Sequence, residues 1–311
     1  MRIAVRVLAG VVLLLAGLTA FDYLAPYTAA RAGLSLEQRR SGLHESRATI
    51  AGFEIPYLEG GQGEPLLLIH GFGADKNNFT RVARFLTPHY RVIAPDLPGF
   101  GAATRSDTAT YTIAEQVERL REFARGLGLK RVHLGGSSMG GHIATTWAGK
   151  YPDEVASLWL LAPGGTVAAF DSELRREFQR TGEILLVAKT PEEHARVRAF
   201  VMSHEPWLPY SVQRVLGERA AADYALHSRI FDALRQEQPV ETLFPRIDAP
   251  ALIVWGTEDR ALNPKGADTL KAMMPRAQVI LMPGIGHLPM IEAVRQSAED
   301  YLAFRHNLAG S

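Results

Sequence analysis

Short apolar runs alternate with helical patterns along most of the chain, and this alternation limits the possible folds more than any other feature. The runs are rich in Val, Ile and Leu on both faces, which is typical of buried parallel strands. Between them, apolar residues recur at steps of three and four, as they do in amphipathic helices. The runs lie at residues 65–71, 90–96, 131–137, 157–163, 251–256 and 277–283. This series predicts an α/β fold, with a mostly parallel central sheet and helices on both faces.

One interval breaks the alternation. Residues 166–247 contain helix signals but no convincing buried strand. We predict that they form a helical lid inserted into a main domain made of residues 31–165 and 248–311. The interval carries a set of large apolar residues suited to lining a cavity, namely Phe200, Met202, Trp207, Leu208, Tyr210 and Phe231. Any one of them is more often a packing residue, but as a group they favour a lid.

The amino terminus holds the most apolar segment. Two arginines precede an uncharged run, Val7–Phe21, which an aspartate ends. As a helix this run would span only ~22 Å, against the ~30 Å of a bilayer core. Extension over Ile3–Leu24 reaches the required length, so we predict a single membrane anchor within residues 1–30. A cleaved signal peptide is the alternative, although Leu18 stands where the cleavage site prefers a small residue.

Charge and composition exclude several classes of function. Lys and Arg number 34 against 33 Asp and Glu, for a net charge of +1. Because no basic block is present to neutralise a run of phosphates, we expect no nucleic-acid partner. The chain has 0 cysteines, which rules out disulfides, thiolate nucleophiles and cysteine-based zinc sites. We expect neither a metal nor a cofactor.

A G-x-S-x-G sequence follows one predicted strand directly and precedes a helix. It reads Gly136-Ser137-Ser138-Met139-Gly140. Such a turn is tight and strained, so small residues must flank the serine, whose hydroxyl then stands at the carboxyl edge of the sheet. Glycine-rich turns also bind phosphate or simply close loops, but the context of strand, turn and helix favours a nucleophile. The glycine spacing selects Ser138 over Ser137.

A serine hydroxyl needs a base within hydrogen-bond reach, and the base needs a third group to orient it. His287 lies in a glycine-rich loop after the last predicted strand, and Asp259 follows the preceding strand. A lone loop histidine is more often a surface residue, but here the order Ser, Asp, His is the one expected for this fold. We assign His287 as base and Asp259 as orienting acid. Glu258 is the rival carboxylate.

The oxyanion formed by attack on a carbonyl also needs donors. The sequence HGFG at residues 70–73 ends an apolar strand, and its glycines let backbone amides approach a ligand. We assign the amides of Phe72 and Met139 to this hole. His70, Trp207 and Leu208 are candidate substrate contacts.

At this point the sequence resembles a known superfamily. The segments HGFGADKNNF, YRVIAPDLPGFG, GGSSMGGHIA, WGTEDR and GIGHLPMIE stand in the order and spacing of α/β-hydrolases, over about residues 65–305. Within that superfamily the chain resembles the bacterial family V lipases, the membrane-bound monoacylglycerol lipases and, most of all, inner-membrane phospholipases A of the PlaF type. Ser138, Asp259, His287, Phe72 and Met139 match the family motifs residue by residue.

The resemblance implies a serine ester hydrolase that releases a fatty acid from a lipid or other acyl ester. The expected substrates are phospholipids, lysophospholipids or monoacylglycerols. It also implies attachment to the bacterial inner membrane with the catalytic domain in the periplasm, or secretion if the leader is cleaved. It is compatible with a homodimer formed through the anchor and the neighbouring helix.

Three alternatives share the same fold. A carbon-carbon bond hydrolase of ring-cleavage products uses the same triad, but a soluble enzyme of that kind needs no amino-terminal apolar run. A soluble or secreted carboxylesterase would follow if the leader is cleaved. A catalytically silent ligand receptor is disfavoured, because all three triad residue types and both oxyanion motifs are present. Dehalogenases and epoxide hydrolases are excluded because they need an aspartate in place of Ser138.

Overall fold

The computed structural model describes residues 2–310 and is built around a single eight-stranded sheet with the order β1-β2-β4-β3-β5-β6-β7-β8. Met1 and Ser311, the outermost residues of the predicted anchor and main domain, lie outside the described residues. From β4 to β8 all neighbouring strands are parallel. The strands are β1 (Leu43–Ile50), β2 (Phe53–Gly60), β3 (Pro65–Ile69), β4 (Arg91–Pro95), β5 (Val132–Ser137), β6 (Val155–Leu161), β7 (Ala251–Gly256) and β8 (Ala277–Met282).

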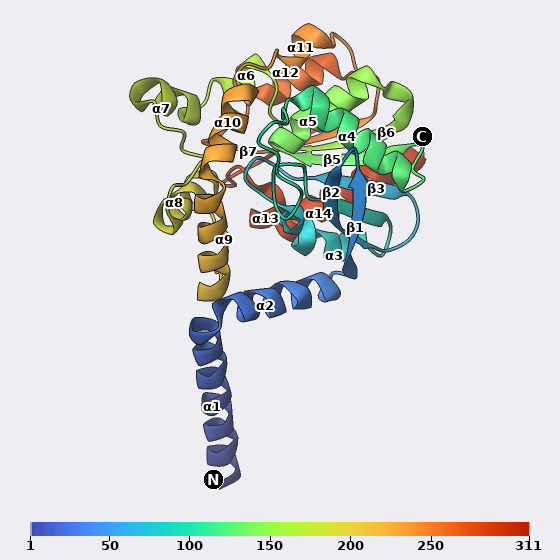
Figure 1. Cartoon of the computed structure of the whole chain (residues 1–311). Helices are drawn as coiled ribbons and strands as arrows, with labels where there is room; N and C mark the ends of the chain where they lie inside the picture. The colour runs from blue at the N-terminus through green and yellow to red at the C-terminus, as the bar shows by residue number, and fades with distance from the viewer. Residues whose placement is uncertain (1, 311) are drawn as a thin grey trace.

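Helices cover both faces of this sheet, and this arrangement confirms the predicted fold class (Figure 1). Helices α4, α5 and α12 pack into the hydrophobic core on one face. Helices α3, α13 and α14 pack into the core on the other face. These helices are α3 (Thr80–Leu86), α4 (Ile113–Gly126), α5 (Met139–Lys150), α12 (Gly266–Met273), α13 (Pro289–Glu292) and α14 (Val294–Ala309), and short 3₁₀ helices lie at η1 (Lys76–Phe79) and η2 (Pro152–Glu154).

The strands β1 and β2 form an antiparallel hairpin that the sequence analysis did not predict. Its turn consists of Ala51 and Gly52, with φ values of 49° and 82°. Positive φ at both central residues matches the right-handed twist of paired strands. β1 is an edge strand with many exposed residues, so it lacks the continuous apolar run by which the buried strands were recognised.

The interval between β6 and β7 is fully described, and its regular structure is helical. It contains α6 (Val167–Phe170), α7 (Glu173–Thr181), α8 (Pro191–Val201), α9 (Tyr210–Ala222), α10 (Tyr224–Leu234) and α11 (Val240–Leu243). All of these helices fall within the interval 166–247 that was predicted as a lid.

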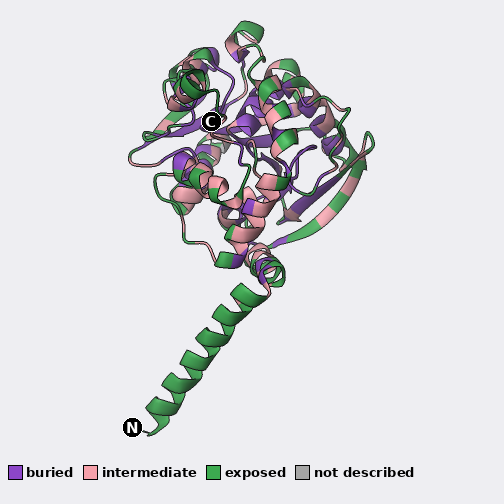
Figure 2. Ribbon diagram, turned by 60° about the vertical axis from the view of Figure 1, so that its left-hand side comes forward, coloured by how far each residue is buried: buried purple, intermediate pink, exposed green. Residues whose placement is uncertain are grey.

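Two helices precede the sheet. Helix α1 (Arg2–Leu24) projects from the body of the protein with no buried residue, and it is green along its length in Figure 2. Its 23 residues correspond to ~34 Å, and its composition suits a membrane span. Pro26 starts a separate helix, α2 (Pro26–Arg40), because a proline ring is accommodated at a helix start but not in a helix interior. Helix α2 packs against α9, α3 and β1.

Candidate active site

Ser138 lies on the turn between β5 and α5, in a backbone conformation that residues other than glycine rarely adopt. Its φ is 55° and its ψ is −117°. The flanking glycines are required by space: a Cβ at Gly136 would lie 2.3 Å from the Gly140 oxygen, and one at Gly140 would lie 2.0 Å from the Ile69 oxygen. A strained backbone held by such close packing is characteristic of functional turns.

The two serines of the motif differ in access. Ser137 is fully buried at the end of β5, and its hydroxyl is among the buried groups without a hydrogen-bond partner within the described chain. Ser138 is half-buried. Ser138 is therefore the more accessible of the two serines, and its role as nucleophile stays a prediction.

His287 and Asp259 are joined by a short hydrogen bond. The distance from His287 Nδ1 to Asp259 Oδ2 is 2.7 Å, and both side chains are buried. Trp255 Nε1 donates to the same Oδ2 at 2.8 Å, while Oδ1 accepts the amides of Ala261 and Leu262, each at 2.9 Å. Because a carboxylate with these partners is held in one orientation, His287 is held as well.

The rival carboxylate points elsewhere. Glu258 is exposed, and its Oε1 accepts the Thr257 hydroxyl at 3.3 Å. The geometry therefore favours Asp259 as the partner of His287.

The sheet topology brings the three candidates to one edge. Ser138 follows β5, Asp259 follows β7 and His287 follows β8, and the carboxyl ends of parallel strands share an edge. Within residues 2–310, the hydrogen bonds of Ser138 are made by its backbone rather than by a contact with His287. Hydrogen bonds between nucleophile and base are often long before substrate binds.

The predicted oxyanion donors flank the Ser138 turn. Met139 is the first residue of α5, where backbone N–H groups lack an intrahelical acceptor. The loop that carries Phe72 presses against the turn, since a Cβ on Gly71 would lie 3.2 Å from Ser138 Cβ. The Phe72 ring packs on Phe231 of α10, with 5.6 Å between centroids. The predicted lid thus contacts the loop whose amide we assign to the oxyanion hole.

His70 braces this loop. Its Nδ1 lies 2.8 Å from the Gly71 carbonyl and its Nε2 lies 3.0 Å from the Leu97 amide. A carbonyl only accepts and an amide only donates, so these partners select the neutral ring with the proton on Nδ1. Burial lowers the pKa of His70 and favours the same form. Both ring nitrogens have hydrogen-bond partners in the protein backbone. We therefore infer that His70 fixes the positions of the Gly71 and Leu97 backbone groups near the site.

Glu292 is a residue that the sequence analysis did not single out. Its carboxylate accepts the amides of Gly286 at 3.1 Å and Leu288 at 3.2 Å, on either side of His287. It also accepts the amides of Ser203 and His204, just after lid helix α8, at 2.8 and 2.9 Å. The Glu292 carboxylate therefore binds both the loop that carries His287 and the segment that follows α8. The sequence signal was the glutamate in GIGHLPMIE, but its partners on the lid are some 90 residues away.

A second pair of serine and histidine lies at the opposite end of the sheet. His133 Nδ1 and Ser157 Oγ are 2.8 Å apart, near the starts of β5 and β6. Only 3% of His133 and 1% of Ser157 is exposed, so no substrate reaches this pair in the folded protein. We interpret it as a structural hydrogen bond.

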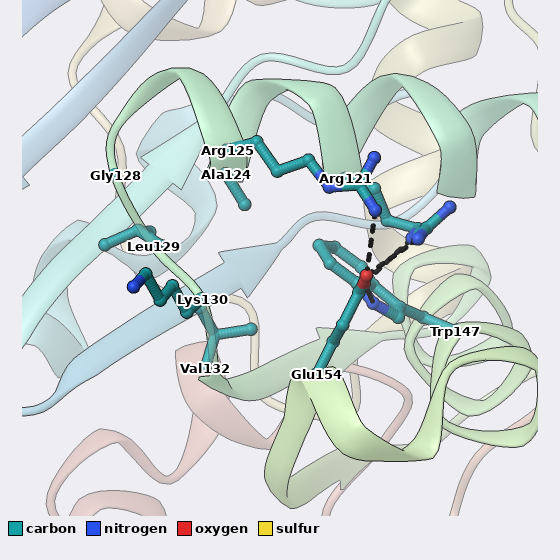
Figure 3. Close-up of a pocket in the computed structure, with 9 residues that line it drawn as sticks. All are labelled: Arg121, Ala124, Arg125, Gly128, Leu129, Lys130, Val132, Trp147 and Glu154. Atoms are coloured by element: carbon teal, nitrogen blue, oxygen red, sulfur yellow. Dashed lines mark hydrogen bonds and ion pairs between the residues drawn. The ribbon is translucent and has the colours of Figure 1, made fainter.

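A hollow of about 330 Å³ opens near the same end of the sheet, where β5 begins at Val132 (Figure 3). Its one acidic lining residue, Glu154, is already engaged, because it binds Arg121 at 2.7 Å, Arg125 at 3.0 Å and the Trp147 indole at 3.0 Å. The Arg121 hydrogen bond is the main cause that lowers the pKa of Glu154 to about 2. We interpret this cluster as structural.

Comparison with known proteins agrees with the observed fold. Residues 64–294 match the family model described as alpha/beta hydrolase fold. The chain is 38% identical to Lipase 3 of Moraxella sp. (strain TA144), over 88% of this chain and 89% of the relative. It is 30% identical to monoacylglycerol lipase ABHD6 of Mus musculus, over 79% of this chain and 78% of the relative. A crystal structure of a bacterial membrane phospholipase A superposes with a TM-score of 0.90 at 41% identity, covering 100% of both chains. The chain therefore belongs to the α/β-hydrolase family, and within it to the carboxylic ester hydrolases of the lipase and phospholipase type.

Proposed function

We propose that this enzyme hydrolyses acyl esters of membrane lipids through a triad of Ser138, His287 and Asp259. The observation that carries the proposal is the 2.7 Å hydrogen bond between His287 and Asp259, at the sheet edge where the strained Ser138 turn lies. The names of the relatives favour phospholipids or monoacylglycerols as substrates, and we include lysophospholipids because they carry the same kind of acyl ester.

The proposed reaction passes through an acyl-enzyme. The Ser138 oxygen attacks the ester carbonyl while His287 Nε2 takes the hydroxyl proton, and the amides of Phe72 and Met139 stabilise the oxyanion. Collapse of this intermediate breaks the ester bond, and His287 returns the proton to the departing alcohol. A water molecule, deprotonated by His287, then attacks the acyl-enzyme. Collapse of the second intermediate breaks the bond to the Ser138 oxygen, which regains its proton from His287 as the fatty acid is released.

Lipid mass spectrometry tests the substrate class. Purified enzyme incubated with a mixed membrane lipid extract should produce free fatty acid together with the matching lyso-lipid or glycerol. The position of the remaining acyl chain reports regioselectivity in the same experiment. Turnover of short soluble esters with no change in any membrane lipid would refute the lipid assignment and leave a simple carboxylesterase.

A separate prediction concerns the attachment of the protein to the membrane through α1. Burying a side chain such as leucine is worth ~1.5–3 kcal/mol, and α1 exposes many such residues. We expect the full-length protein to stay with bacterial inner membranes through high-salt and alkaline washing, with its catalytic domain on the periplasmic side. A form that begins at Ala25, and so keeps α2, should become soluble and lose activity on vesicles more than on short esters.

Protein sequencing of the native enzyme provides the control. Retention of the amino terminus through α1 is expected of an anchor. A soluble native protein that begins near Phe21 would show instead that the segment is a signal peptide. Cross-linking of the full-length and shortened forms tests whether a homodimer depends on α1.

Glu292 should affect turnover although it lies outside the triad. Glutamine preserves the size of the side chain but replaces one acceptor oxygen with an NH₂ group that faces backbone donors. We expect Glu292→Gln to lower kcat on a short soluble ester by up to ~100-fold, as small displacements of catalytic groups do, while circular dichroism stays unchanged. Glu299→Gln, on an exposed pair with Arg295, is the matched control and should be normal. Equal activity of the two variants would show that Glu292 does not position His287.

A further inference from the structure

The carboxyl end of the anchor helix α1 contacts the predicted lid. Asp22, near the end of α1, accepts the backbone amide of Ser211 in the first turn of lid helix α9 at 3.3 Å. The rings of Tyr23 and Tyr210 stack beside it, 4.4 Å apart and 7° from parallel. Figure 1 shows α1, α2 and α9 meeting at this point. Because first-turn N–H groups lack intrahelical partners and carry positive partial charge, the Asp22 carboxylate suits this position.

Other contacts hold α9 between the anchor and the main domain. The Tyr27 hydroxyl of α2 donates to Glu218 at 2.5 Å. The next residue of α9, Arg219, pairs with Asp75, in the loop after β3, at 2.8 Å. These contacts place α9 against the end of α1, against α2 and against the main domain.

Trp207 lies four residues before Ser211 and is 82% exposed. The other three tryptophans, Trp147, Trp159 and Trp255, are at most 1% exposed. Four residues of extended chain reach at most ~14 Å, so Trp207 is close to the charged residue that ends the apolar part of α1. Tryptophan concentrates at the interface between lipid and water, where its ring is buried and its N–H stays hydrated.

We propose that residues 205–210, the interfacial loop, lie in the headgroup region of the bilayer that holds α1, with Trp207 inserted between lipids. The proposal rests on the membrane attachment proposed above and extends it to the lid. The bilayer is the occupant because the loop meets α1 at the Tyr23–Tyr210 ring stack, and no residue of the described helix α1 is buried. Insertion would hold the amino end of α9 at the lipid surface. A lipid leaving the bilayer would then contact Trp207 and Leu208 before it reaches the rest of the predicted lid.

Quenching of tryptophan fluorescence reports on Trp207, because the other three tryptophan side chains are buried in the core. Full-length enzyme is reconstituted in phosphatidylcholine and phosphatidylglycerol vesicles, with bromine placed near the ester end or near the methyl end of the acyl chains. We expect stronger quenching by bromine near the ester end and weak quenching by aqueous iodide. Both signals should be assignable to Trp207 by their loss in Trp207→Phe.

Two other outcomes would overturn the proposal. Strong iodide quenching without bromine quenching would place Trp207 in water. Protection from both quenchers would place it against a second copy of the chain, and this protection would weaken as the protein is diluted in lipid.

Activity supplies a second readout on the same samples. The ratio of vesicle-lipid to short-ester hydrolysis should fall several-fold in Trp207→Ala and less in Trp207→Phe, which keeps an aromatic ring. If the wild-type enzyme hydrolyses no vesicle lipid, the lipase assignment fails, while the quenching result still decides where the interfacial loop lies.

Discussion

Replacement of Ser138 by alanine is expected to abolish ester hydrolysis and labelling by a fluorophosphonate. Loss of the nucleophile in a serine hydrolase costs ~10⁶-fold in kcat, because the base and the oxyanion hole cannot replace the covalent step. The backbone strain at φ 55° is the same for serine and alanine, so Ser138→Ala should fold and melt like the wild type. Activity-based labelling, steady-state kinetics and thermal unfolding check the three parts of this result.

Ser137→Ala is the matched control for the nucleophile. The Ser137 hydroxyl is buried without a partner in the described chain, so its removal leaves no group unsatisfied and should preserve labelling. If Ser137→Ala loses the label and Ser138→Ala keeps it, the nucleophile has been misassigned.

Asp259→Asn is expected to lower turnover by ~10⁴-fold, the cost known for losing the orienting carboxylate of a triad. The reason lies in the four donors around this side chain. One asparagine orientation turns its NH₂ group toward the amides of Ala261 and Leu262, which are themselves donors. The other turns it toward His287 Nδ1, so that the ring proton moves to Nε2 and His287 can no longer accept the proton of Ser138.

Glu258→Gln is the control for this prediction. The Glu258 side chain is exposed and accepts only a weak bond from Thr257, at 3.3 Å, so kcat should stay near the wild-type value. A severe loss in Glu258→Gln together with near-normal Asp259→Asn would move the orienting role to Glu258.

The core of the fold was predictable because its signals are local. Buried strands need continuous apolar runs, and all six predicted runs correspond to strands of the sheet. Strand β1 was missed because it lies at the sheet edge, exposes many side chains to water and carries no such run. Its partner β2 is mostly buried, but Glu54, Pro56 and Glu59 interrupt its apolar residues. Pro26 marks the end of α1 in the sequence, yet the path of α2 depends on packing against α9 and α3.

The candidate triad was also visible in the sequence, for a related reason. Each member follows a strand directly, and parallel strands place their carboxyl ends at one edge, so topology alone predicts that Ser138, Asp259 and His287 gather there. The sequence assigned the orienting role to Asp259 and kept Glu258 as its rival, since both follow β7. In the structure Asp259 turns inward to the donors of Trp255 and His287, whereas Glu258 turns outward.

The sequence by itself determined the six strands with apolar runs, the strained serine turn and the apolar amino-terminal helix, because each depends on residues that are neighbours along the chain. Only the tertiary structure decided which contacts hold the predicted lid against α1 and the main domain. Glu292 binds amides 88 and 89 residues away, and Asp22 meets Ser211 across 189 residues. No local pattern encodes such contacts, since a carboxylate accepts from any donor within reach. Which donor comes within reach depends on how the packed helices place the lid over the sheet.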